Sequence, residues 1–104
     1  MTHVPPQYYL YILLCDHEFL YTGIALDPSE RVQQHRKGKP HGAKYTRRFS
    51  HLDLVYQVKI GSRSAAQKFE YHLKKCAKSK KLNIINNQPT KHELCELLPS
   101  INLD

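Results

Sequence analysis

Apolar and aromatic residues gather in two runs near the start of the chain, separated by a short polar break. Residues Tyr8–Leu14 form a continuous run of aromatic and branched side chains, which is typical of a buried strand. Residues 15–18 interrupt this run, and a second run of β-type residues follows at Phe19–Ala25. Because the break is short, the pattern predicts that the two runs pair as an antiparallel hairpin.

A helix and a third strand are predicted after this hairpin. Asp27 and Pro28 are residues that typically cap and begin a helix, and Glu30 is placed to return a hydrogen bond to the cap. We expect this helix to end at Gly38. The alternation of apolar and polar residues over 52–60 then predicts a strand with one face directed inward.

The second half of the chain predicts mainly helices. Apolar residues recur at helical spacing over 66–76, which predicts a helix capped by Ser62 or Ser64. Residues 82–89 end at a proline, and we expect an irregular segment there. Residues 91–98 are expected to form a short amphipathic helix.

Together these elements predict an α+β fold in one domain of residues 1–104. The expected architecture is a three-stranded antiparallel sheet flanked by helices, in β-β-α-β-α order with a C-terminal helical tail. A chain of 104 residues can bury one modest core. Any function must therefore be carried by this single fold.

The charge of the chain narrows the choice of partner. Lysine and arginine number 16 against 9 acidic residues, which gives a formal net charge of +7. Such a basic chain favours a polyanion, and nucleic acid is the first candidate. A membrane is the rival partner, but no run approaches the ~20 apolar residues of a span. The N-terminus has no secretory signal pattern, so we expect a cytoplasmic protein that does not bind membranes.

Cysteine and histidine spacing gives no metal-binding motif. Cys15, Cys76 and Cys95 are odd in number and form no close pair, which argues against a disulfide framework and against a zinc knuckle. The seven histidines likewise show no paired ligand spacing. We interpret most of them as surface residues.

Two short strings and two single residues, in a fixed order, carry the most specific signal in the sequence. Leu10-Tyr11-Ile12 lies on the first predicted strand and Tyr21-Thr22-Gly23 on the second, while Arg31 and Glu70 lie on the two following helices. This order resembles the GIY-YIG nuclease superfamily, and within it the small stand-alone branch of UPF0213 type. The first glycine of the motif is absent, and Thr22 replaces its middle residue. Three further segments are similar to the family: Glu30–His35, Gly42–Arg47 and Phe69–Tyr71.

The resemblance implies a divalent-metal-dependent endonuclease that hydrolyses phosphodiester bonds of nucleic acid, with DNA preferred. It implies Mg²⁺ or Mn²⁺ as the cofactor. The motif-bearing core would span about residues 8–76 and leave residues 77–104 as a tail. Because a single domain of this size has no evident specificity module, we also expect a protein partner that helps to choose the substrate.

Two tyrosines are candidates for activating the attacking water. Phosphodiester hydrolysis needs an activated water, charge neutralisation at phosphorus and help for the leaving oxygen. Tyr11 can act as general base, or orient the water, if a cation or metal lowers its pKa from about 10. Tyr21, on the paired strand, can project from the same sheet face. The alternative for Tyr11 is an aromatic side chain packed in the core. The alternative for Tyr21 is a simple cross-strand aromatic pair.

Arg31 and His35 lie four residues apart and therefore share one face of the first predicted helix. We assign Arg31 to transition-state charge stabilisation, and His35 to phosphate contact or proton transfer. A solvated pair is the alternative interpretation. Glu70 borders the apolar stripe of the second helix and can hold Mg²⁺, which needs only one or two carboxylates. A salt bridge from Glu70 to Arg31 or a lysine is the alternative.

Residues that could bind the nucleic-acid backbone lie around this constellation. Gly23 leaves room for a close approach of the sugar-phosphate backbone, or else marks a bulge. A second basic zone spans residues 74–81. Solvated surface is the usual meaning of such charge runs. The predicted contacts in the loop are Lys39, Lys44, Arg47 and Arg48 as backbone clamps, with Tyr45 as a stacking ring.

Three functions remain open from the residues alone. The first is the metal-dependent endonuclease, with Tyr11, Tyr21, Arg31, His35 and Glu70 as its catalytic set. The second is a non-catalytic nucleic-acid-binding module that keeps the nuclease fold. The third is an interaction scaffold, which would bind its partner without sensitivity to salt.

Overall fold

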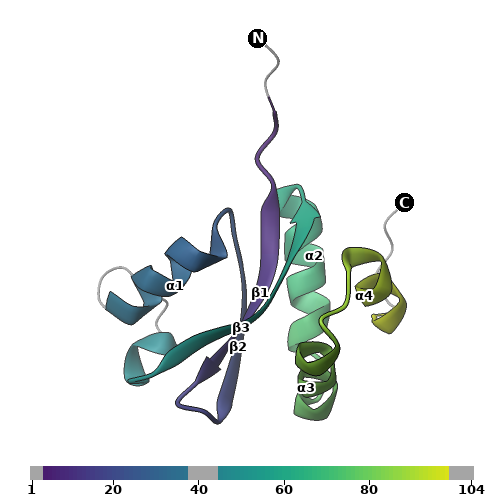
Figure 1. Cartoon of the computed structure of the whole chain (residues 1–104). Coiled ribbons are helices and arrows are strands. Elements are labelled where there is room, and N and C mark those ends of the chain that lie inside the picture. The colour runs from purple at the N-terminus through teal and green to yellow at the C-terminus, as the bar shows by residue number, and fades with distance from the viewer. Residues whose placement is uncertain (1–3, 38–44, 99–104) are drawn as a thin grey trace.

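A computed structural model describes residues 4–37 and 45–98 of the chain. It contains one antiparallel sheet in the order β2-β1-β3, with α1 on one side and α2, α3 and α4 on the other (Figure 1). The strands are β1 (Tyr8–Cys15), β2 (Phe19–Ala25) and β3 (Leu52–Gly61). The helices are α1 (Pro28–Lys37), the short 3₁₀ helix η1 (Thr46–Arg48), α2 (Arg63–Lys74), α3 (Lys78–Asn87) and α4 (Lys91–Leu97). This architecture confirms the predicted α+β class and order of elements.

The first two strands form the predicted hairpin. Their register pairs Tyr11 with Gly23, and the connecting turn has Asp16 and His17 at its two central positions. Both residues have positive φ, 50° and 60°, and the Glu18 amide donates to the Cys15 carbonyl at 3.1 Å. These features define a β-turn over Cys15–Glu18 within a three-residue connection, and its left-handed central residues give a twist that matches that of the strands.

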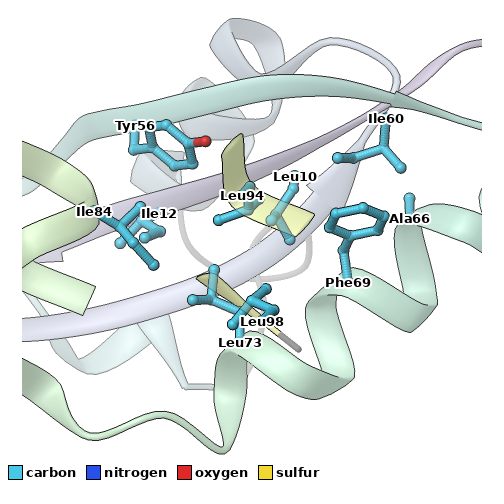
Figure 2. Packing of buried hydrophobic residues seen from close by; sticks show 10 residues of the cluster. All are labelled: Leu10, Ile12, Tyr56, Ile60, Ala66, Phe69, Leu73, Ile84, Leu94 and Leu98. Atoms are coloured by element: carbon cyan, nitrogen blue, oxygen red, sulfur yellow. The ribbon is translucent and has the colours of Figure 1, made fainter. Parts of the chain in front are cut away.

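The central strand β1 is buried on both of its faces, which explains its continuous apolar sequence. Leu10 and Ile12 point into a core shared with α2, α3 and α4. Tyr11, Leu13 and Cys15 point the other way, into a smaller cluster with Val32 of α1. Figure 2 shows the larger cluster, made of Leu10, Ile12, Tyr56, Ile60, Ala66, Phe69, Leu73, Ile84, Leu94 and Leu98.

The predicted starts of α1 and α2 agree with the structure, whereas α2 ends at Lys74, before the last residue of the predicted helical pattern over 66–76. The Glu30 amide donates to Asp27 Oδ1 at 3.2 Å, so Asp27 caps α1. Ser62 rather than Ser64 caps α2, because its side chain accepts from the Ala65 amide. The predicted end of α1 at Gly38 lies outside the described residues. The short helix expected over 91–98 is α4.

The expectation of an irregular segment over 82–89 is wrong. Residues 78–87 form α3, and the helix ends at Gln88, which has a φ of 50°. Ile84 is fully buried in the core, whereas Leu82 is 41% exposed. With one buried anchor and no glycine after its last turn, α3 has neither a clear apolar stripe nor a recognisable stop signal.

Candidate active site

Tyr11, Tyr21 and His35 meet on the α1 side of the sheet, from three different elements. The Tyr11 hydroxyl lies 3.0 Å from His35 Nε2. The rings of Tyr11 and Tyr21 are 6.4 Å apart between centroids, and those of Tyr21 and His35 are 5.2 Å apart. The two phenols therefore share one sheet face, as their positions on paired strands led us to expect.

Gly23 makes room for the Tyr11 side chain. A Cβ at position 23 would lie 2.6 Å from the Tyr11 hydroxyl oxygen, closer than side-chain atoms approach in proteins. The register explains this contact, because Gly23 is the β2 partner of Tyr11. The close approach that the sequence indicated at Gly23 is thus made by Tyr11 itself. Contact of Gly23 with a nucleic-acid backbone stays a prediction.

His35 links the tyrosines to the loop before β3. Its Nδ1 lies 2.7 Å from Thr46 Oγ1, which gives a buried chain of hydrogen-bonding groups from Tyr11 through His35 to Thr46. Only 2% of His35 is exposed, and Thr46 is fully buried. Burial, with a smaller effect from the Arg31 guanidinium, lowers the pKa of His35 to about 4. The imidazole is therefore neutral at pH 7, with one ring nitrogen as donor and the other as acceptor.

Thr46 is a site residue that the sequence did not single out. A threonine inside a basic loop has no periodicity that would mark it as the partner of a distant histidine. Its position in the family-like segment Gly42–Arg47 was the only available signal.

Both phenols are protonated at neutral pH. Burial raises the pKa of Tyr11 above its usual value, and neighbouring Tyr21 adds to this effect. The Arg31 guanidinium opposes the rise through its charge and a hydrogen bond, but it does not reverse it. Burial also raises the pKa of Tyr21. Arg31 alone therefore does not supply the lowered tyrosine pKa that we expected a cation to give.

Arg31 projects from α1 toward the two phenols. Its Nη1 donates to Gln34 Oε1 at 2.8 Å, one turn further along the helix. A surface pocket of about 300 Å³ includes both of these side chains, together with Glu30. Arg31 is thus held beside the tyrosines and borders an opening to solvent.

Glu70 approaches the site from the other layer of the molecule. Its helix α2 packs on the face of the sheet opposite to Tyr11, but it also contacts the edge strand β2. The Glu70 carboxylate adds to burial in raising the pKa of both Tyr11 and Tyr21, so it lies within electrostatic reach of both phenols. It also pairs with Lys74 Nζ at 3.4 Å, which is the salt bridge weighed above.

The Glu70 carboxylate suits a hard divalent cation. Its side chain is 22% exposed, so it is fixed by its surroundings yet open to solvent. Magnesium binds proteins through one or two carboxylates and keeps several water ligands. One partly exposed carboxylate within electrostatic reach of two phenols fits that requirement.

The segment before β3 places the Tyr45 ring against Tyr21 and the Arg48 guanidinium against Tyr45. The Tyr45 ring stacks on Tyr21 at 5.8 Å between centroids, and the Arg48 guanidinium lies 4.8 Å from the Tyr45 centroid. Arg47 is exposed. The predicted contacts Lys39 and Lys44 lie outside the described residues.

A second pocket joins the loop to the basic end of α2 and α3. Its volume is about 310 Å³, and its walls include Tyr21, Tyr45, Lys74 and Lys81. Thr22 also lines it, and its buried hydroxyl has no hydrogen-bond partner within the described part of the chain. The basic zone over residues 74–81 therefore borders a hollow beside β2, to which the loop contributes Tyr45.

Comparison with known proteins identifies the family. The model of the GIY-YIG catalytic domain matches residues 7–83. The chain belongs to the GIY-YIG family. Members of this nuclease family act on nucleic acid and generally use a divalent metal. Among the described residues of this GIY-YIG domain, no helix is long and apolar enough to cross a bilayer.

Similar proteins carry UPF0213 names. One from Pectobacterium carotovorum subsp. carotovorum is 45% identical over 84 residues, which cover 81% of this chain and 83% of that protein. One from Serratia proteamaculans is 37% identical over 101 residues, which cover 97% of this chain and 95% of that protein. The solution NMR structure of a UPF0213 protein from Bacillus halodurans aligns with a TM-score of 0.50 and 32% identity, covering 91% and 99%. The solution NMR structure of a protein from E. faecalis aligns with a TM-score of 0.54 and 30% identity, covering 83% of this chain and 90% of that chain.

Proposed function

We propose that this domain is a Mg²⁺- or Mn²⁺-dependent endonuclease that cleaves DNA at the site formed by β1, β2, α1 and α2. The observation that carries the proposal is the buried chain from Tyr11 through His35 to Thr46, with Arg31 and Glu70 beside it. A tyrosine packed only for stability needs one partner for its buried hydroxyl, whereas Tyr11 also has Arg31 and Glu70 within electrostatic reach.

The hydrogen-bonded chain supplies a route for the proton of the attacking water. With Nδ1–H of His35 donating to Thr46, Nε2 is the unprotonated nitrogen and accepts from the Tyr11 hydroxyl. Tyr11 oxygen can then take a proton from the water while it passes its own to His35, and His35, whose pKa is about 4, returns that proton through Tyr11 to the leaving oxygen. A phenol with a raised pKa is a weak base by itself, and this coupled transfer avoids a free phenolate.

Charge at phosphorus would be balanced by Arg31 and by a metal on Glu70. The Arg31 guanidinium can form two parallel hydrogen bonds to phosphate oxygens as negative charge develops. Tyr21 would position the same phosphate by donating from its hydroxyl. A divalent cation held by Glu70 and by water ligands would neutralise charge on the scissile phosphate. Loading this cation requires the Lys74 ammonium to move away from the carboxylate.

The hollow beside β2 would hold the strand that leaves the site. Tyr45 offers a ring that is 38% exposed, and Lys74 and Lys81 offer cations for the backbone. Arg47 and Arg48 extend this basic border along the loop. We keep Gly23, Lys39 and Lys44 as further predicted contacts.

The substitution Glu70→Ala tests the metal assignment. Purified wild-type and variant proteins are incubated with duplex, single-stranded and branched DNA, with Mg²⁺, with Mn²⁺ or with a chelator. We expect the wild type to cleave only with metal, and the variant to lose about 10²-fold or more of that rate, the loss typical of a transition-state charge partner. DNA binding measured by anisotropy should be retained.

Glu96→Ala is the matched control. Glu96 is an exposed acid on α4 that pairs with His92, so its removal makes the same change in net charge away from the site. It should leave the rate unchanged. Full metal-dependent cleavage by Glu70→Ala would contradict the metal site. Salt-sensitive binding by a wild-type protein that cleaves none of the substrates would favour the non-catalytic binding module instead.

A further inference from the structure

Two histidines and an aspartate meet at the turn between β1 and β2, outside the candidate active site. The ligand atoms of His17, His51 and Asp53 all lie within 4.8 Å of one another. The two imidazole centroids are 4.6 Å apart, and His51 Nε2 lies 3.4 Å from Asp53 Oδ2. The three side chains come from the turn, from the residue before β3 and from β3 itself.

Hydrogen bonds join the two segments that carry the histidines. Asp16 Oδ1 accepts from the amides of Ser50 at 3.0 Å and His51 at 2.8 Å. The Asp16 amide in turn donates to the His51 carbonyl at 2.7 Å. The turn that carries His17 is therefore fastened to the segment that carries His51. These bonds fix the two backbone segments relative to each other, and the exposed imidazoles can still rotate on them.

His17 is an unusual residue for its position. It has a φ of 60° at the second central position of the turn, where glycine is strongly preferred. Histidine tolerates this conformation better than most residues, but at some cost in free energy. A ligand for the imidazole would explain why the position does not carry glycine.

We propose that His17, His51 and Asp53 form a binding site for Zn²⁺ or a chemically similar transition-metal ion. Two imidazoles and one carboxylate are a common zinc ligand set, completed by water in the fourth position. Tetrahedral ligation with bonds of about 2.1 Å places ligand atoms about 3.4 Å apart. His51 and Asp53 already have this separation. His17 and His51 are exposed, so rotation of their side chains can close the remaining gap.

This site is separate from the proposed magnesium site and serves a different purpose. The turn lies beyond the Cys15–Phe19 pair, and Tyr11 lies four residues back along β1, about 13 Å at the usual rise per residue. An ion at the turn would therefore not reach the scissile phosphate. It would tie the hairpin to the start of β3 and stabilise the folded chain by mass action. Magnesium, which prefers oxygen ligands, would not replace it.

Calorimetry with the full chain and zinc chloride alone tests the proposal. His17→Asn is the informative variant, because asparagine keeps the left-handed backbone conformation but loses the imidazole. We expect His17→Asn and His51→Ala each to weaken zinc binding at least tenfold. His92→Ala, which removes an exposed histidine from α4, should bind as the wild type does. In NMR spectra, the ring signals of His17 and His51 should shift with zinc while the His92 signal stays in place.

The proposal would be overturned by zinc affinity that survives both substitutions, or by the absence of binding heat and of ring-signal shifts in the wild type. Retained amide spectra in both variants verify that they are folded. The Glu70→Ala variant should keep this zinc site, because its carboxylate lies elsewhere. Loss of zinc binding in His17→Asn together with normal nuclease activity would therefore separate this inference from the proposed function.

Discussion

Position 23 tolerates nothing larger than glycine while Tyr11 keeps its present place. The substitution Gly23→Ala would put a methyl group 2.6 Å from the Tyr11 hydroxyl oxygen, so the phenol or the edge strand must shift. We expect a loss of about 1–3 kcal/mol in the free energy of unfolding, as for other overpacked sites. Cleavage should fall by more than tenfold, since Tyr11 would leave its hydrogen bond to His35. Urea denaturation and a nuclease assay measure the two effects.

Gly61→Ala provides the comparison. Gly61 has a φ of 139°, and a Cβ there would meet nothing within 4 Å, so the cost comes from the backbone alone. This variant should lose stability but keep the cleavage rate of its folded fraction. Equal loss of activity in both variants would show that the fit between Gly23 and Tyr11 is not specific to the site.

His35 makes stability depend on pH in a defined window. Its pKa is about 4 in the folded chain, because of burial and Arg31, against an ordinary value of 6.5. Between these values the unfolded chain binds more protons, so the free energy of unfolding must fall as pH is lowered from 6.5 to 4. The resulting loss in the free energy of unfolding reaches about 3 kcal/mol at low pH. Above pH 6.5 His35 is neutral in both states and causes no loss.

Urea denaturation across this pH range, for wild type and His35→Gln, isolates the effect. The difference in slope between the two proteins should appear between pH 6.5 and 4 and vanish above it. Parallel stability curves would mean that His35 is not held neutral by the fold. His92→Ala, at an exposed histidine, should follow the wild type throughout.

Local sequence reasoning could find the residues of the site but not all of their contacts. Tyr11, Tyr21, Arg31 and Glu70 were singled out by the family resemblance, and the spacing of four placed His35 on the same helix face as Arg31. Thr46 could not be found this way, because its partner lies eleven residues away across the loop. The raised pKa of Tyr11 was also out of reach, since it depends on burial between two layers.

At the scale of elements, α3 shows where apolar periodicity ceases to be informative. The strands and α2 each carry several buried residues, and their ranges were predicted closely. In α3 only Ile84 is fully buried, so the sequence pattern contained one anchor and no stripe. Its helical conformation is maintained by packing in the larger core, which no local window reveals.

Some residues beyond position 76 contribute to the core, so substitution of their buried side chains should destabilise the domain. Leu94 of α4 is fully buried in the larger cluster, and Leu94→Ala should cost about 2–5 kcal/mol. Leu82→Ala on α3 removes the same atoms from a side chain that is 41% exposed, and should cost much less. Thermal and urea unfolding of both variants measure the difference. Similar costs would imply that α4 is not docked as described.

At the scale of the whole molecule, the net charge of +7 should make nucleic-acid binding strongly dependent on salt. The logarithm of the binding constant should fall linearly with the logarithm of salt concentration. Lys81→Ala, at the hollow beside β2, should reduce that slope by about 1. Anisotropy titrations with labelled DNA over a range of salt concentrations measure the slope.

Lys59→Ala is the control for this titration. Lys59 is exposed on β3, at the opposite edge of the sheet from β2, so it changes the net charge equally without touching the hollow. Its slope should match that of the wild type. Identical reductions for both lysines would indicate that the chain attracts DNA through its overall charge only.

The buried face of α1 includes a residue of the candidate site. The three buried residues of α1 are Pro28, Val32 and His35, so the imidazole proposed to carry the proton is also one of the few side chains that anchor this helix to the sheet. Evolution therefore cannot adjust His35 for chemistry without also loosening the helix that presents Arg31. Among natural and laboratory variants, changes at His35 would lower soluble yield and turnover together. Changes at Glu70, on the solvent border, leave these two properties free to vary independently.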